Sequence, residues 1–107
     1  MVMEKQLLFR GVLRPLVLSV LLENETTYGY LLIKTISEAS GGELTITEGA
    51  LYPLLRKLER EGVIKGELEK HNLRGKKVYK LTTVGKRQAQ EELKDSKLFL
   101  KTLDHLL

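Results

Sequence analysis

The sequence of 107 residues predicts one mainly α-helical unit with a small β-hairpin. Three observations support this fold class. Apolar residues recur at helical spacing from about residue 11 to residue 60, and again from residue 83 to the end. Two short runs of alternating apolar and polar residues lie between those stretches and flank a polar turn. The chain contains no cysteine, which excludes disulfides and thiolate metal sites.

A strongly apolar segment predicts the first helix from about Gly11 to Leu22. Pro15 fits best in the first turn, where its missing N–H removes no needed hydrogen bond. A helix that begins earlier and bends at Pro15 is also compatible with the sequence. Because the segment is apolar on most sides, we expect it to be buried against more than one neighbour.

A second helix is expected from Tyr28 to about Ser40, with Thr27 as its N-cap and Gly41–Gly42 after its end. Tyr30 is assigned to its buried face because it joins the apolar positions. Only a few residues, among them the short extended piece 44–46, separate this helix from the next, as a helix-turn-helix requires. The apolar positions are Leu32, Ile33, Ile36 and Ala39.

The third helix is the most clearly marked part of the chain. Thr47 is a suitable N-cap, Glu48 places negative charge in the first turn, and Gly62 is a suitable residue just past the end. Pro53 lies past the first turn and removes the hydrogen bond to the Gly49 carbonyl. The helix has an apolar face of Leu51, Leu54, Leu55 and Leu58, and an opposite face of Gly49, Tyr52, Pro53, Arg56, Lys57 and Arg60.

A hairpin is predicted from the alternating runs Val63–Glu69 and Lys77–Thr82, with a polar tip between them. From Gly62 to Thr82, six basic residues stand against two acidic ones, so this stretch carries the whole net charge of +4. Such a basic segment is typical of a nucleic-acid footprint, and a solvated lysine-rich hairpin would have the same composition.

Thr82 or Thr83 is expected to cap a last helix that runs to the C-terminus. This helix has more apolar surface than a small core has room for, which favours a homodimer built on it. The alternative is that the helix folds back onto the first helix of its own chain. The sequence thus divides into residues 1–82 and a dimerisation helix, 83–107. The expected interface residues are Leu93, Leu98, Phe99, Leu100, Leu103, Leu106 and Leu107.

Together these elements predict a winged helix-turn-helix that binds double-stranded DNA. Such a domain buries the leucine face of this helix and presents the opposite, aromatic and basic face to DNA, together with the basic hairpin that follows. Tyr28 and Lys34 are expected at phosphates, and Arg74 in a minor groove. The full set of candidate DNA-binding residues is Tyr28, Lys34, Thr47, Glu48, Gly49, Tyr52, Pro53, Arg56, Lys57, Asn72, Arg74, Lys76 and Lys77.

Several of these residues have two interpretations. Tyr52 either contacts DNA or packs against the second helix, and Glu48 either caps its helix or accepts from a cytosine amine. Arg56 reaches a phosphate, or a guanine if it points inward. Lys76 and Lys77 are expected to neutralise phosphates without reading sequence.

The chain resembles the PadR family of transcriptional regulators from residue 8 to about residue 85. The resemblance rests on ordered motifs: Leu8-Phe9-Arg10-Gly11, Tyr28-Gly29-Tyr30, Gly49-Ala50-Leu51-Tyr52-Pro53-Leu54-Leu55, Leu58-Glu59-Arg60-Glu61-Gly62 and Tyr79-Lys80-Leu81-Thr82 with Gly85. It implies a dimeric winged-helix protein on operator DNA, usually a repressor. The short C-terminal part resembles the compact subgroup with a single last helix.

The resemblance also implies release from DNA by a small phenolic, aromatic or cationic effector. In the compact multidrug-responsive subgroup a tryptophan of the last helix stacks on planar ligands. This chain has no tryptophan, and Phe99 is the only aromatic residue of its last helix.

Other functional classes are less well supported by the residues. No nucleophile–base set, paired carboxylates, phosphate-binding glycine loop or metal cluster is recognisable, so we expect neither an enzyme nor a cofactor or metal. The longest apolar run is far below the ~20 residues of a membrane span, and no signal peptide is evident, so the cytoplasm is expected. A winged-helix protein–protein interaction module without DNA function remains the alternative.

Overall fold

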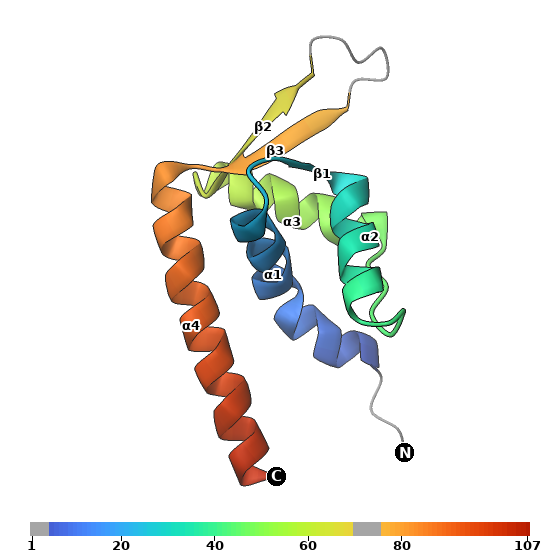
Figure 1. Ribbon diagram of the computed structural model, residues 1–107, viewed down its shortest axis with the longest axis vertical. Coiled ribbons are helices and arrows are strands. Elements are labelled where there is room, and N and C mark those ends of the chain that lie inside the picture. Colours follow the sequence, from blue (N-terminus) through green and yellow to red (C-terminus); the bar gives the residue numbers. More distant parts are fainter. Residues whose placement is uncertain (1–4, 70–75) are drawn as a thin grey trace.

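The computed structural model describes residues 5–69 and 76–107, and side chains from residue 11 onward. Among these residues the helices and strands pack into a winged helix-turn-helix with a long last helix (Figure 1). The elements in order are α1 (Lys5–Glu23), β1 (Thr27–Tyr28), α2 (Gly29–Ala39), α3 (Glu48–Arg60), β2 (Ile64–Leu68), β3 (Lys77–Leu81) and α4 (Thr83–Leu106).

Helix α1 lies at the centre and packs against both α2 and α4, as its apolar character predicts. It begins at Lys5, so Pro15 lies inside the helix and the earlier of the two expected starts is correct. The core that it shares with the other elements contains Val17, Leu18, Leu32, Leu51, Leu55, Leu58 and Val63, all fully buried.

The start of α2 differs from the prediction. Thr27 is not its N-cap: the helix begins at Gly29, the N-cap position is Tyr28, and no side chain caps it. Thr27 instead lies buried in the two-residue strand β1, where it pairs with Tyr79 of β3. Ala39, expected on the buried face of α2, is exposed.

The sheet is antiparallel with strand order β1-β3-β2, so β3 is its central strand. The predicted hairpin is confirmed, with Ile64 opposite Leu81 and Leu68 opposite Lys77. The strand β1 ties this wing to the start of α2, which places the wing beside the helix-turn-helix (Figure 1).

Helix α3 has the predicted ends. Thr47 Oγ1 accepts a hydrogen bond from the Ala50 N–H at 3.2 Å. At the other end Gly62 has φ +74°, and the N–H groups of Gly62 and Val63 donate to the carbonyls of Glu59 and Leu58. This pair of bonds is a Schellman motif, whose left-handed position glycine adopts without strain. It turns the chain sharply from α3 into β2.

Helix α4 is capped by Thr82, whose Oγ1 accepts from the Gly85 N–H at 2.9 Å. Its first half folds back on α1, where Gly85 and Ala89 are buried. An arginine joins these helices: Arg14 Nε donates to Glu92 Oε1 of α4 at 2.7 Å, and Arg14 Nη2 donates to Glu61 Oε1 at 2.7 Å. Arg14 thus links α1, α4 and the C-terminal end of α3.

Candidate nucleic-acid interface

The solvent-facing side of α3 carries the residues that the sequence assigns to DNA. Five candidates are exposed here, and Thr47 stands at the N-cap. Thr47 and Glu48 therefore both serve the helix start, one as the cap and one as a charge in the first turn. On the other side Leu51, Leu55 and Leu58 are buried and Leu54 is partly buried, so the helix packs on the core while its polar side stays accessible. The exposed candidates are Glu48, Gly49, Pro53, Arg56 and Lys57.

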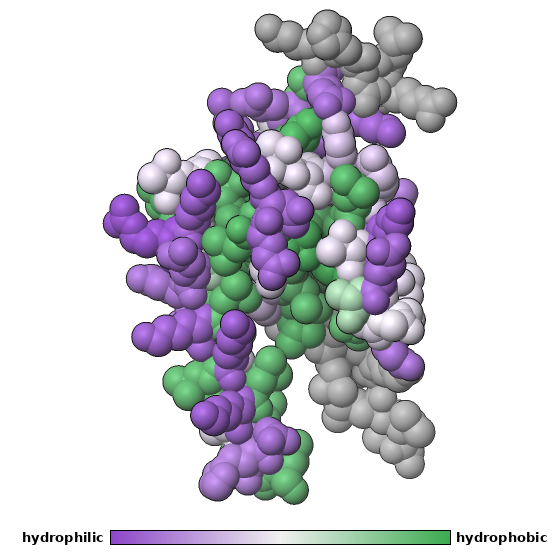
Figure 2. Space-filling model, in the orientation of Figure 1, coloured by the Kyte–Doolittle hydropathy of each residue, from purple (hydrophilic) through white to green (hydrophobic). Residues whose placement is uncertain are grey.

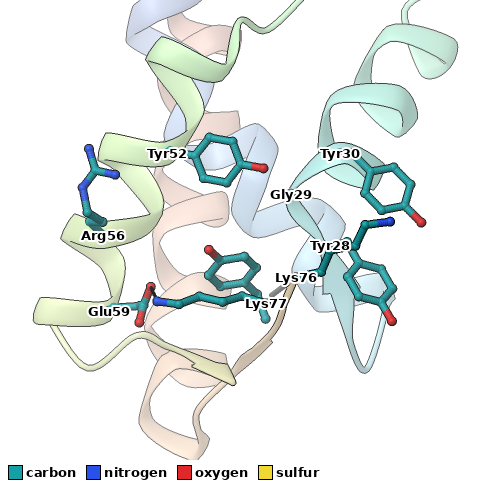
Figure 3. Close-up of a pocket in the computed structure, with 9 residues that line it drawn as sticks. Tyr28, Gly29, Tyr30, Tyr52, Arg56, Glu59, Lys76 and Lys77 are labelled. Atoms are coloured by element: carbon teal, nitrogen blue, oxygen red, sulfur yellow. Dashed lines mark ion pairs between the residues drawn. The ribbon is translucent and has the colours of Figure 1, made fainter. Parts of the chain in front are cut away.

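A hollow of about 430 Å³ lies between α3, the start of α2 and the base of the wing (Figure 3). It brings together five of the candidates from three separate segments: Tyr28, Tyr52, Arg56, Lys76 and Lys77. The sequence prediction did not assign the remaining lining residues to the interface; they are Gly29, Tyr30, Glu59 and Tyr79.

Tyr52 packs against the start of α2, as one of its two interpretations requires. A Cβ atom on Gly29 would lie 2.6 Å from the Tyr52 hydroxyl and 3.0 Å from its ring. Only a glycine leaves room for this ring, so the close approach fixes the distance between α2 and α3. The ring stays half-exposed and lines the hollow, with its hydroxyl directed toward Gly29 (Figure 3).

Tyr30 is exposed, which shows that its assignment to the core was wrong. Its side chain is 49% exposed and stacks on Tyr28, with ring centroids 5.5 Å apart. Lys76 Nζ lies 4.9 Å from the centroid of the Tyr30 ring, a cation–π contact between the wing and α2. The two tyrosines thus form an aromatic platform beside the basic residues.

The ionised groups of the hollow are mixed in sign. Lys77 Nζ lies 3.8 Å from Glu59 Oε1, so the wing is also linked to α3 (Figure 3). Burial raises the pKa of Tyr79, and a hydrogen bond to the Glu69 carboxylate raises the pKa of Tyr28. The Tyr28 hydroxyl is thus already donated to a carboxylate within the protein.

The other candidates are not gathered at this hollow. Lys34 is exposed on α2, 4.0 Å from Glu38. Asn72 and Arg74 lie outside the described residues. Glu59 had a usable sequence signal, because it follows Tyr52 and Arg56 at helical spacing on the same side of α3.

The second half of α4 presents apolar side chains to solvent. Leu98 and Phe99 are each 63% exposed, and Leu106 is 73% exposed. Hydrophobic side chains are visible over the C-terminal half of this helix in Figure 2. Leu93 is half-buried nearer the start of the helix. The alternative of folding back onto the first helix is thus confirmed for the first half of α4, and the second half is left uncovered.

The described residues hold no cluster of three or more metal-ligating side chains. In the same part of the chain, no helix combines the length and the apolar character that crossing a membrane demands.

Comparison with known proteins identifies the family. A family model for the PadR-like transcriptional regulators matches residues 17–91. An uncharacterized protein X of Lysinibacillus sphaericus is 32% identical over 89 residues, which cover 82% of this chain and 81% of that protein.

Solved structures agree with that match. A PadR family transcriptional regulator from Eggerthella lenta is 32% identical, with a TM-score of 0.79 over 94% of this chain and 86% of that one. A transcriptional regulator from Clostridium thermocellum shares the fold with a TM-score of 0.83 over 99% of both chains, at 24% identity. The chain belongs to the PadR-like family of transcriptional regulators, which bind DNA and are not enzymes.

Proposed function

We propose that this protein is a homodimeric repressor that binds a specific operator in double-stranded DNA. In this proposal the N-terminal half of α3 enters the major groove, and the start of α2 and the base of the wing hold the flanking phosphates. Each protomer would contact one half-site, with the half-sites about one helical turn, ~10 bp, apart.

The observation that carries the proposal is the convergence of basic and phenolic side chains from three segments on one face. Arg56 projects from α3, and Tyr28 precedes α2. Lys77 begins the wing strand β3, and Lys76 directly precedes it. Cationic and O–H donors on one face suit the phosphate backbone, while the exposed polar side of α3 suits base edges.

Arg56 provides the sharpest test of base reading. We expect Arg56→Ala to weaken binding to the best duplex selected from a randomised library by roughly tenfold, and binding to random DNA by much less. Arg87→Ala is the matched control, because Arg87 is also an exposed arginine and lies on α4, away from the hollow. Fluorescence anisotropy with both duplexes measures the difference.

An equal loss on both duplexes would show that Arg56 only holds phosphate. No loss on either would remove the middle of α3 from the interface. If wild-type protein fails to bind any duplex at low salt, a protein–protein interaction module without DNA function becomes the leading hypothesis.

The proposed dimer is supported by the uncovered half of α4. The side chains of Leu100 and Leu103 are 49% and 38% exposed in the protomer, and they continue the apolar surface of Leu98, Phe99 and Leu106. A second copy of the chain would bury this surface, which a lone protomer leaves in water at a free-energy cost.

The double substitution Leu100→Glu/Leu103→Glu should therefore yield a folded monomer, because neither side chain belongs to the protomer core. Leu68→Glu is the control, since Leu68 is an exposed leucine on the wing. Sedimentation velocity gives the mass, and circular dichroism verifies the helices. A double variant that remains dimeric would place the interface elsewhere.

A small aromatic effector that releases DNA is the last part of the proposal. It is supported by the family resemblance and by Phe99, an exposed aromatic ring on the apolar half of α4. Effector candidates would be screened by the fall in fluorescence anisotropy of labelled operator DNA as the protein is released. The Phe99→Leu variant should stay on the DNA when the effector is added.

A further inference from the structure

The wing is fastened to the start of α2 by side chains as well as by strand pairing. Tyr28 pairs with Val78 across β1 and β3. Lys76 lies on the Tyr30 ring, and the Tyr28 hydroxyl donates a hydrogen bond to Glu69 Oε1. The last of these contacts places a carboxylate on a residue that the proposed function assigns to phosphate.

Glu69 reaches Tyr28 across the central strand of the sheet. It follows the last residue of β2, and its N–H donates to the Lys76 carbonyl at 3.2 Å, which continues the ladder between β2 and β3. Tyr28 pairs with Val78, so these two side chains lie on one face of the sheet. Side chains alternate along a strand, which places Lys76 and its neighbour Glu69 on that same face. The backbone therefore holds the carboxylate directly beside the hydroxyl.

A phenol has a single O–H and can donate it to only one strong acceptor at a time. A carboxylate and a phosphodiester are both anionic oxygen acceptors, and both form short charge-assisted hydrogen bonds. A DNA phosphate that accepts the hydrogen bond of the Tyr28 hydroxyl must therefore displace Glu69.

We propose that Glu69 is an autoinhibitory stand-in for phosphate, which occupies the Tyr28 hydroxyl in the free protein and thereby lowers its affinity for DNA. This inference rests on the proposed DNA-binding function and adds a residue that regulates it. Because phosphate contacts carry no base information, the effect is the same on cognate and random DNA.

The test compares Glu69→Gln with Glu67→Gln. Both variants remove one negative charge from the same end of the wing, but the Glu67 carboxylate pairs with Lys65 at 3.0 Å, whereas the Glu69 carboxylate accepts the Tyr28 hydrogen bond. Glu67→Gln also frees Lys65, which makes it a demanding control. We expect Glu69→Gln to bind DNA roughly three- to tenfold more tightly than Glu67→Gln does, on cognate and random duplexes alike.

The Tyr28→Phe background isolates the mechanism. Phenylalanine keeps the ring that stacks on Tyr30 and removes only the hydroxyl. In this background Glu69→Gln and Glu67→Gln should bind DNA equally well. Circular dichroism melting of all variants verifies that each is folded.

Three results would overturn the inference: equal affinities of the two glutamine variants, a difference that persists in Tyr28→Phe, or weaker binding by Glu69→Gln. These results leave the proposed function intact as long as the wild-type protein binds DNA. If wild type and variants all fail to bind at low salt, both the proposed function and the inference are wrong.

Discussion

Gly85→Ala should destabilise the protein, even though alanine is the better helix former. A Cβ atom at this position would lie 1.8 Å from the Val63 carbonyl oxygen and 2.9 Å from Thr82 Oγ1. Carbon and oxygen atoms that are not bonded to each other normally stay about 3.3 Å or more apart. The distance to the Val63 oxygen is therefore shorter than a normal contact by more than 1 Å, and α4 or the Val63 peptide must move by roughly that amount.

The obstacle cannot easily give way. The Val63 carbonyl accepts from the Thr82 N–H at 3.0 Å, and the Thr82 hydroxyl donates to the preceding Gly62 carbonyl at 2.6 Å, so the orientation of this turn is fixed. Overpacking of this kind typically costs about 1–3 kcal/mol, and a rigid backbone obstacle favours the upper end. Helix propensity returns up to about 1 kcal/mol. We expect a net loss of about 2 kcal/mol in the free energy of unfolding.

Urea unfolding at one fixed protomer concentration measures the loss, because the proposed dimerisation would make stability depend on concentration. Gly11→Ala is the matched control. Gly11 also lies inside a helix, but a Cβ there has no neighbour within 4 Å, so the change should stabilise the protein by up to about 1 kcal/mol. If Gly85→Ala unfolds at the wild-type urea concentration or above it, the account of how α4 is anchored is wrong.

Two further predictions concern the wing and the link between helices. Lys76→Ala/Lys77→Ala should weaken binding to all DNA and lower the salt slope by up to about two charges, and an unchanged slope would remove the base of the wing from the interface. Arg14→Met should cost about 1 kcal/mol of stability at pH 7, because Arg14 hydrogen-bonds lower the pKa of both Glu61 and Glu92. That stabilisation is complete above the ordinary glutamate pKa and is lost as pH falls through the lowered values. The difference in urea unfolding between the two proteins should therefore shrink as the pH is lowered below the ordinary glutamate pKa; a difference independent of pH would contradict this reasoning.

Local sequence signals were sufficient for the elements whose ends are set by neighbouring residues. Thr47 and Gly62 mark the two ends of α3, because a cap and a Schellman glycine act within a few residues. Thr82 marks the start of α4 for the same reason. The hairpin also follows from local alternation.

Long-range contacts explain what the sequence did not reveal. Thr27 looks like a helix cap, but β1 forms only because β3 lies beside it, some fifty residues later in the chain. Tyr30 fits an apolar helical pattern, yet its ring stacks on Tyr28 outside the core. Arg14 stands among apolar residues, and both of its carboxylate partners are distant in sequence.

The candidate interface was predictable in composition and less so in arrangement. The sequence predicts Arg56, Lys76 and Lys77 as DNA-binding residues, and the structure places all three around one hollow. It left open whether Tyr52 packs or faces DNA, since only the spacing between α2 and α3 at Gly29 shows the packing. The contact between Tyr28 and Glu69 depends on strand register, which local patterns do not define.

The most direct test of the central claim is a gel-shift titration at two salt concentrations. The probe is the DNA immediately upstream of the gene for this protein, with unrelated DNA as competitor. The account predicts a retarded complex that survives the competitor and weakens at the higher salt concentration. No retardation of either DNA at low salt would contradict it.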